Sequence, residues 1–132
     1  MRREASCTCG QLRLTVDGEP TRIGICHCLA CQRRTGSAFG LHVRFRAADV
    51  ETSGEAHRYT RLADDDGDTR TISFCPVCSD VVWLVGGGEP DLVGVPVGAF
   101  ADPGFPPPTY EVYEHRRHAW VGLPDDLVRF KD

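Results

Sequence analysis

The sequence lacks any long hydrophobic run, and this absence argues against a membrane-spanning helix. The longest uninterrupted apolar stretch covers only residues 81–85, whereas a spanning helix needs about 20 predominantly apolar residues. Residues 1–6 also lack the apolar core of a secretory signal peptide. We therefore expect a cytoplasmic protein that has no membrane partner.

Lysine is almost absent, because 14 of the 15 basic residues are arginine, and the formal net charge is −4. An acidic balance disfavours non-specific binding to nucleic acid, whose phosphates attract basic surfaces. The adjacent pairs Arg33-Arg34 and Arg116-Arg117 still allow local basic patches, although paired arginines most often lie on a solvated surface. We therefore expect a small-molecule substrate and no nucleic-acid partner.

No apolar pattern of helical period extends over twelve or more residues, which argues against a helical fold. Two stretches instead alternate with period two: residues 11–16 place Leu12, Leu14 and Val16 on one face, and residues 41–46 place His42 and Arg44 opposite an apolar face. Further short strands are expected at 22–26, 55–62, 69–74, 81–84, 92–97 and 110–115. The sequence predicts an all-β fold of short antiparallel strands in one domain, residues 1–132.

Three segments between the predicted strands have local signatures of their own. Residues 32–37 are expected to form a short helical turn that ends at Gly36. The acidic segment 64–68 lacks the alternating spacing and distal glutamate of a calcium loop, so we expect a solvated hairpin turn. The proline-rich segment 103–108 is expected to form an irregular loop.

The chain has seven cysteines, and three of them crowd into the stretch Cys26-His27-Cys28-Leu29-Ala30-Cys31. An odd number of cysteines in a reducing compartment argues against a disulfide framework. Free cysteine packs as a small hydrophobe, which gives no reason for three thiols so close together. The crowding favours a soft metal, and three protein ligands with one open position are typical of a catalytic zinc site.

The spacing of the cysteines allows two partitions. In the first, the pairs Cys7/Cys9 and Cys75/Cys78 form one tetrahedral four-thiolate site, and the triplet forms a second site. In the second, a zinc ribbon joins Cys28-x-x-Cys31 to Cys75-x-x-Cys78 and leaves the other three cysteines without a role. We prefer the first partition because it leaves no orphan thiol.

The cysteine blocks and their neighbours resemble the glutathione-dependent formaldehyde-activating enzyme family. The resemblance covers nearly the whole chain, through Trp120 and the tail at 123–125. It rests on three motifs: Cys7-x-Cys9-Gly10, Cys26-His27-Cys28-x-x-Cys31-Gln32-Arg33-Arg34-x-Gly36-Ser37 and Phe74-Cys75-x-x-Cys78. One departure is Ser79-Asp80, where family members usually carry glycine and then a small residue. A glycine there relieves the turn, and we expect Asp80 to cap or hydrogen-bond in its place.

The resemblance implies a fold, two metal sites and a reaction. The implied fold is a small zinc-binding β-tent of crossed antiparallel sheets. The implied structural zinc is held by Cys7, Cys9, Cys75 and Cys78, and the implied catalytic zinc by Cys26, Cys28 and Cys31. The implied activity is addition of glutathione to formaldehyde to give S-hydroxymethylglutathione, classed as a carbon–sulfur lyase for the reverse direction.

An anionic substrate needs positive charge beside a three-thiolate zinc. Glutathione carries two carboxylates, and arginine binds a carboxylate through two parallel hydrogen bonds. Arg33 and Arg34 follow the triplet directly and are the predicted glutathione-binding residues, with Arg44 and His42 as weaker candidates. His27 is a less favoured metal ligand because both of its neighbours are predicted ligands.

Two function classes remain open from the sequence. The first is a small zinc enzyme that acts on a thiol adduct, and the second is a non-catalytic zinc module that binds a protein partner. A closed second site, with His115, His118 or another side chain as its fourth ligand, favours the module. A third, less favoured class is a metal-handling or redox protein, since exposed thiolates oxidise.

Overall fold

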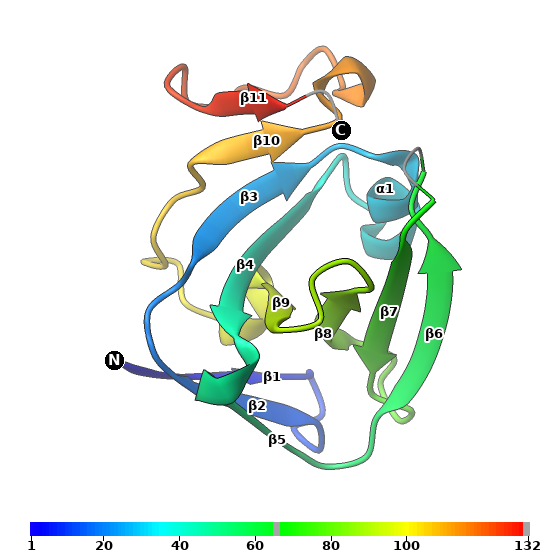
Figure 1. Ribbon diagram of the computed structural model, residues 1–132, viewed down its shortest axis with the longest axis vertical. Coiled ribbons are helices and arrows are strands. Elements are labelled where there is room, and N and C mark those ends of the chain that lie inside the picture. Colours follow the sequence, from blue (N-terminus) through cyan, green and yellow to red (C-terminus); the bar gives the residue numbers. More distant parts are fainter. Residues whose placement is uncertain (65–66, 131–132) are drawn as a thin grey trace.

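The computed structural model describes residues 1–64 and 67–130, and these residues form two β-sheets and one short α-helix (Figure 1). The smaller sheet has the strand order β1-β2-β5 and is antiparallel. Its strands are β1 (Arg2–Ser6), β2 (Arg13–Asp17) and β5 (Val50–Ser53). All-β architecture with crossed sheets is thereby confirmed.

The larger sheet has eight strands in the order β11-β10-β3-β4-β9-β8-β7-β6. In Figure 1 it bends so that the half containing β3 and β4 faces the half containing β6 and β7. Its strands are β3 (Arg22–Cys26), β4 (Gly40–Arg46), β6 (His57–Leu62), β7 (Thr69–Phe74), β8 (Val81–Gly86), β9 (Leu92–Pro96), β10 (Tyr110–Val112) and β11 (Val128–Phe130).

The helical segments of the described chain are all short. The helix α1 (Leu29–Thr35) is capped at its C-terminus by Gly36, whose φ of 68° is the left-handed conformation that the predicted helix end requires. The 3-10 turns are η1 (Ala47–Asp49), η2 (Val97–Phe100) and η3 (Glu114–Arg116). The predicted helical turn at 32–37 is therefore real, although the helix begins three residues earlier.

The hydrophobic core lies between the two sheets, and the alternating sequence pattern explains it. Leu14 and Val16 of β2 are buried against Val43 and Phe45 of β4, and these four side chains are at most 1% exposed. Burying one such side chain contributes about 1.5–3 kcal/mol, so the two alternating strands predict much of the core. The side chains on the opposite face of the larger sheet point away from this core.

Several strand predictions need correction. The predicted strand 110–115 ends at Val112, because Tyr113 has a φ of 57° and the chain turns into η3. The strand β10 pairs in parallel with β3 and with β11, so the larger sheet is not wholly antiparallel. The strands β1, β5 and β11 escaped prediction.

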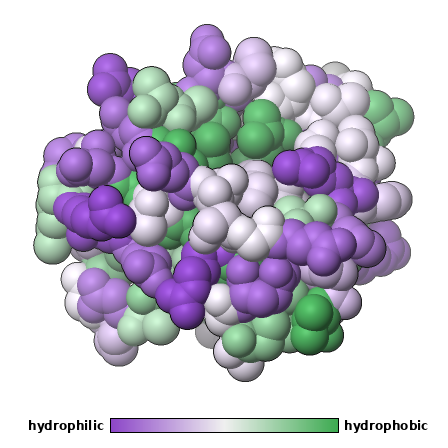
Figure 2. Space-filling view, turned by 90° about the horizontal axis from the view of Figure 1, so that it is seen from below, coloured by the Kyte–Doolittle hydropathy of each residue, from purple (hydrophilic) through white to green (hydrophobic). Residues whose placement is uncertain are grey.

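The predicted loops agree with the structure where it describes them. β6 and β7 pair as an antiparallel hairpin around the acidic segment 64–68, although residues 65 and 66 of that turn lie outside the described residues. Residues 103–108 contain no helix or strand. Hydrophilic side chains cover most of the face in Figure 2, with apolar ones in separate patches between them. None of the helices within 1–64 and 67–130 is long and apolar enough to traverse a bilayer.

Candidate metal centres

Two cysteine pairs from distant parts of the chain come together at one end of the core. The sulfur atoms of Cys7, Cys9, Cys75 and Cys78 all lie within 4.8 Å of one another. The Cys9 sulfur is 3.6 Å from those of both Cys7 and Cys75, and a tetrahedral zinc with Zn–S bonds of about 2.3 Å separates its sulfurs by about 3.8 Å. The geometry therefore fits a four-thiolate zinc site, and the cysteines group as the first partition predicts.

Backbone and side-chain N–H groups point at these sulfurs. The amide of Leu12 lies 3.3 Å from the Cys7 sulfur, and the amide of Val77 lies 3.3 Å from the Cys75 sulfur. The Gln11 side chain donates to the same Cys75 sulfur at 2.9 Å. Such donors stabilise the thiolate, which is the form that binds a metal. Gln11 is a supporting residue that the cysteine spacing does not reveal.

Ser79 and Asp80 stand in place of the expected glycine and small residue without loss of the turn. Ser79 has a φ of 69°, the left-handed conformation that glycine adopts most readily. The Asp80 carboxylate accepts hydrogen bonds from the Thr8 hydroxyl and, at 2.7 Å, from the Thr8 amide. These two bonds lower the pKa of Asp80. The expectation that Asp80 hydrogen-bonds is therefore correct, and its bond ties the Cys75–Cys78 turn to the Cys7–Cys9 loop.

The cysteine triplet forms the second cluster where β3 meets α1. The sulfurs of Cys26, Cys28 and Cys31 also lie within 4.8 Å of one another. Cys28 is the N-cap of α1, and its sulfur accepts the amide of Cys31 at 3.3 Å. Contacts with the thiols of Cys26 and Cys31 lower the pKa of Cys28. Three converging thiols, one of them readily ionised, suit a thiolate-binding metal such as zinc.

His27 turns away from this cluster. Its side chain is fully buried, packs edge-on against Phe39, and has its Nε2 atom 3.8 Å from a carboxylate oxygen of buried Glu111. Burial lowers the pKa of His27, which favours the neutral ring. Within 1–64 and 67–130, no histidine, aspartate or glutamate joins the three thiols as a fourth ligand.

The C-terminal histidines contact other partners. His118 bonds through Nε2 to the Gln32 side-chain oxygen at 2.9 Å, and His115 packs against the ring of Tyr113. Gln32 also donates to the His27 carbonyl at 2.9 Å. Gln32 therefore links the segment of the cysteine triplet to the C-terminal segment, a supporting role that was not predicted from the sequence.

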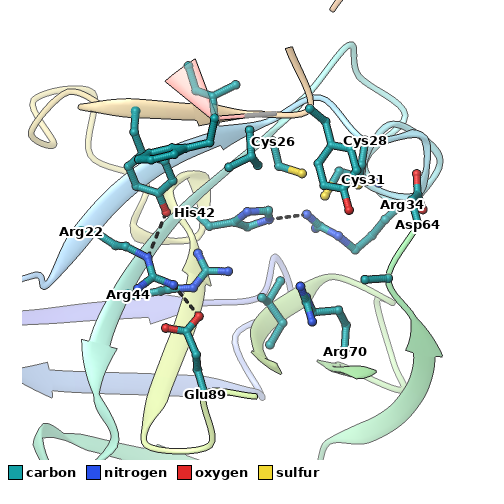
Figure 3. A pocket seen from close by; sticks show the side chains of 18 of the residues that line it. Arg22, Cys26, Cys28, Cys31, Arg34, His42, Arg44, Asp64, Arg70 and Glu89 are labelled. Atoms are coloured by element: carbon teal, nitrogen blue, oxygen red, sulfur yellow. Dashed lines mark hydrogen bonds and ion pairs between the residues drawn. The ribbon is translucent and has the colours of Figure 1, made fainter. Parts of the chain in front are cut away.

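A cavity of about 610 Å³ opens beside the triplet, on the face of the larger sheet that points away from the core (Figure 3). All three cysteines line it. Five arginines and two carboxylates also line it: Arg22, Arg34, Arg44, Arg61, Arg70, Asp64 and Glu89. The residues that line the cavity therefore carry an excess of positive charge, which favours an anionic ligand.

Arg34 and Arg33, the two predicted glutathione-binding residues, have different positions. Arg34 lines the cavity and lies 2.6 Å from Nε2 of His42 through its Nη2 atom. Burial and the neighbouring charges of Arg34 and Arg44 lower the pKa of His42 to about 3, so the neutral ring accepts this hydrogen bond. Arg33 is exposed and is not among the residues that line the cavity.

Aromatic residues of the C-terminal part complete the wall. Tyr113 is buried against Cys28 and Cys31. Tyr110 lies across Gly24, where an added Cβ atom would come within 2.1 Å of the tyrosine ring. Only glycine leaves this space, so Gly24 lets the Tyr110 ring reach over β3 toward the cavity. Neither tyrosine was predicted, since nothing in their local sequence marks them.

Comparisons with known proteins agree with this description. Residues 2–116 match the family described as glutathione-dependent formaldehyde-activating enzyme. The crystal structure of a Rhodobacter sphaeroides protein is similar at a TM-score of 0.53 and 20% identity, covering 79% of this chain and 91% of that one. At this identity the similarity concerns the fold alone. None of the curated proteins matches the chain.

Proposed function

The chain belongs to the family of glutathione-dependent formaldehyde-activating enzymes, and from this premise we propose that it is a zinc-dependent carbon–sulfur lyase. Its substrate is the adduct of glutathione or of another thiol with an aldehyde, such as S-hydroxymethylglutathione. The observation that carries the proposal is the opening of three clustered thiols onto an arginine-lined cavity. A cytoplasmic location is part of the proposal.

In this proposal the two cysteine clusters have different roles. Cys7, Cys9, Cys75 and Cys78 hold a structural zinc, and Cys26, Cys28 and Cys31 hold a catalytic one. When bound at the triplet, zinc with an open position favours the thiolate form of a substrate thiol and withdraws electrons from an oxygen. Support comes from the donor sets, four thiolates for a closed site and three for an open one.

The side chains beside the triplet are suited to orient the adduct. The hydrogen bond to neutral His42 fixes one edge of the Arg34 guanidinium and leaves other N–H groups for a substrate oxygen. In the lyase direction the hydroxymethyl oxygen loses its proton to solvent and forms a carbon–oxygen double bond as the carbon–sulfur bond breaks. The electron pair of the broken bond leaves with the sulfur as a thiolate, and formaldehyde is the other product. Arg34 binds the oxygen or a carboxylate, while buried Tyr113 covers one side of Cys28 and Cys31.

The protein-binding module has less support. That reading needs a closed second site, and among the described residues no fourth ligand of the histidine, aspartate or glutamate type joins the triplet. The large cavity beside the thiols is also the size expected for a small-molecule ligand rather than for a docked protein surface.

Titration of glutathione into the zinc-loaded protein tests the proposed function. Wild type is expected to bind glutathione and to form S-hydroxymethylglutathione from formaldehyde faster than the uncatalysed reaction. Arg34→Ala is expected to weaken binding by about 1.5–3 kcal/mol, because a hydrogen bond to a charged group is lost. The measurement is isothermal calorimetry, with product detected by nuclear magnetic resonance.

Arg33→Ala is the matched control, because it removes an arginine from the same helix outside the cavity. It is expected to leave glutathione binding close to wild type. If wild type shows neither heat nor turnover at millimolar glutathione, the thiol-adduct function is wrong and the protein-binding module takes its place.

A further inference from the structure

The end of the cavity far from the cysteines holds an arginine without an acceptor. Within 1–64 and 67–130, the Arg44 guanidinium forms no hydrogen bond or ion pair. Burial lowers the pKa of Arg44; Arg22 and Arg70 act in the same direction, whereas Tyr110 and Glu89 act in the opposite one. An arginine nevertheless stays charged at neutral pH. A half-buried, unpaired guanidinium in a cavity is costly unless an anion joins it.

None of the carboxylates among the described residues pairs directly with Arg44. The carboxylate of Glu89 is held by Arg22 at 2.6 Å, and Arg22 also donates to the Tyr110 hydroxyl at 3.2 Å. Arg70 pairs with Asp68 at 3.1 Å. In Figure 3, Arg44 lies beside Arg22 and above Glu89, with its guanidinium directed into the open space. The local carboxylates are therefore committed to other arginines.

The strand register places Arg44 at a distance from the cysteine triplet. On the paired strands β3 and β4, Cys26 lies opposite Gly40, and Arg22 lies opposite Arg44. The two pairs are four positions apart along each strand, with three residues between them, which is about 13 Å of strand. Figure 3 likewise shows the three cysteines at one end of the pocket and Arg22 with Arg44 at the other. His42 lies between the two ends, and Arg34 lies on the side of the cysteines.

From this geometry we infer that Arg44 is the binding residue for a substrate carboxylate that lies far from the reacting sulfur. The inference rests on the proposed function, because it assumes that the sulfur binds at the triplet. Arg44 thereby selects by length as well as by charge. A thiol whose carboxylate lies beyond a peptide bond, as in glutathione, spans the cavity, whereas the carboxylate of free cysteine stays near the triplet.

The test compares ligands that differ in one group each. Glutathione, S-methylglutathione, cysteine and 2-mercaptoethanol are titrated by calorimetry into zinc-loaded wild type and Arg44→Ala. The variant is expected to bind glutathione and S-methylglutathione about tenfold to a hundredfold more weakly, the effect of one lost hydrogen bond to a charged group. Binding of cysteine and 2-mercaptoethanol is expected to change less than twofold.

Two further variants complete the test. Arg46→Ala removes the next outward arginine of the same strand, which is paired with Asp49 on the surface, and is expected to bind all ligands as wild type does. Arg44→Lys keeps the charge and should restore part of the affinity for glutathione, because lysine lacks the planar fork. If Arg44→Ala fails to fold, Arg44→Lys takes its place in the test. The proposal then requires that Arg44→Lys binds glutathione more weakly than wild type does and binds 2-mercaptoethanol with unchanged affinity.

The inference is overturned if Arg44→Ala binds glutathione as wild type does, or if it weakens every ligand equally. Failure of the proposed function gives a different result, because that function requires the substrate sulfur to bind at the triplet. In that case Cys28→Ser leaves the affinity for glutathione and for 2-mercaptoethanol unchanged, whereas an intact Arg44 effect on S-methylglutathione still supports the carboxylate site.

Discussion

The two cysteine clusters of this protein differ in how the chain builds them. The four-cysteine cluster joins the loop after β1, in the small sheet, to the turn after β7, in the large sheet. The triplet comes from six consecutive residues at the junction of β3 and α1. The first cluster therefore closes a loop of more than sixty residues, whereas the second closes almost none.

The surroundings of the clusters differ in the same sense. N–H donors contact sulfurs of the four-cysteine cluster, and the Asp80–Thr8 bond joins the two segments that carry it. The triplet instead faces a cavity with charged walls. A metal that binds only the folded chain stabilises it, and the contribution is greatest where binding brings distant segments together. A site that faces a cavity is free to exchange ligands. We therefore expect stability to depend mainly on the first cluster and chemistry on the second.

The largest expected effect comes from breaking the four-cysteine cluster. Cys78→Ser removes one of the four thiols that could hold a metal ion, so a metal bound there, which would tie the two sheets together, is expected to be lost. The variant is expected to aggregate or to lack a cooperative thermal transition, as measured by circular dichroism and soluble yield. A soluble variant that melts within a few degrees of wild type would contradict the structural role.

A smaller effect is expected from Asp80, which supports the same cluster. Asp80→Ala removes the acceptor of the Thr8 amide and hydroxyl and should lower the free energy of unfolding by about 1–2 kcal/mol. Urea denaturation of the zinc-loaded protein measures the change. Asp91→Ala, in the turn before β9, is a surface control, and equal losses in both variants would remove the special role of Asp80.

The smallest expected effect concerns pH and the cavity beside the triplet. Burial lowers the pKa of His42 in the folded protein from 6.5 to about 3. Between these two pH values the unfolded chain binds a proton at His42, whereas the folded protein does not. Stability is then complete above pH 6.5 and declines as the pH falls toward 3. Between pH 7 and 5.5 this amounts to about 1 kcal/mol.

The variant His42→Gln isolates that contribution, because glutamine does not titrate and its oxygen can still accept from Arg34. Denaturation midpoints at both pH values are compared with those of wild type. The variant is expected to lose less stability on acidification, and an equal loss in the two proteins would refute the role of His42.

The sequence predicts the central strands well, but of the edge strands of the two sheets it predicts only β6. Residues 11–16 and 41–46 alternate because one face of each strand is buried, and their strands lie inside the sheets. The missed strands β1, β5 and β11 lie at sheet edges, and β5 and β11 are mostly exposed, so their sequences carry little alternation. Their pairing depends on neighbouring strands, which no local pattern reveals.

The same contrast holds for the candidate site. Cysteine spacing predicts both clusters because metal ligands must come close together, whatever the intervening fold. The adjacency of Arg33 and Arg34 to the triplet cannot tell which one lines the cavity, because their directions depend on the helix. Tyr110 and Tyr113 reach the cavity through the parallel pairing of β10 with β3, a long-range contact that the sequence does not indicate.

Metal content of Cys28→Ser tests most directly the claim that one cluster supports the fold and the other the chemistry. Elemental analysis of the purified proteins should give two zinc ions per wild-type chain, one for each cluster. Cys28→Ser should retain one zinc, a cooperative thermal transition and no turnover of S-hydroxymethylglutathione. The account is contradicted if Cys28→Ser loses both zinc ions or unfolds as completely as Cys78→Ser, since the triplet would then hold the fold together as well.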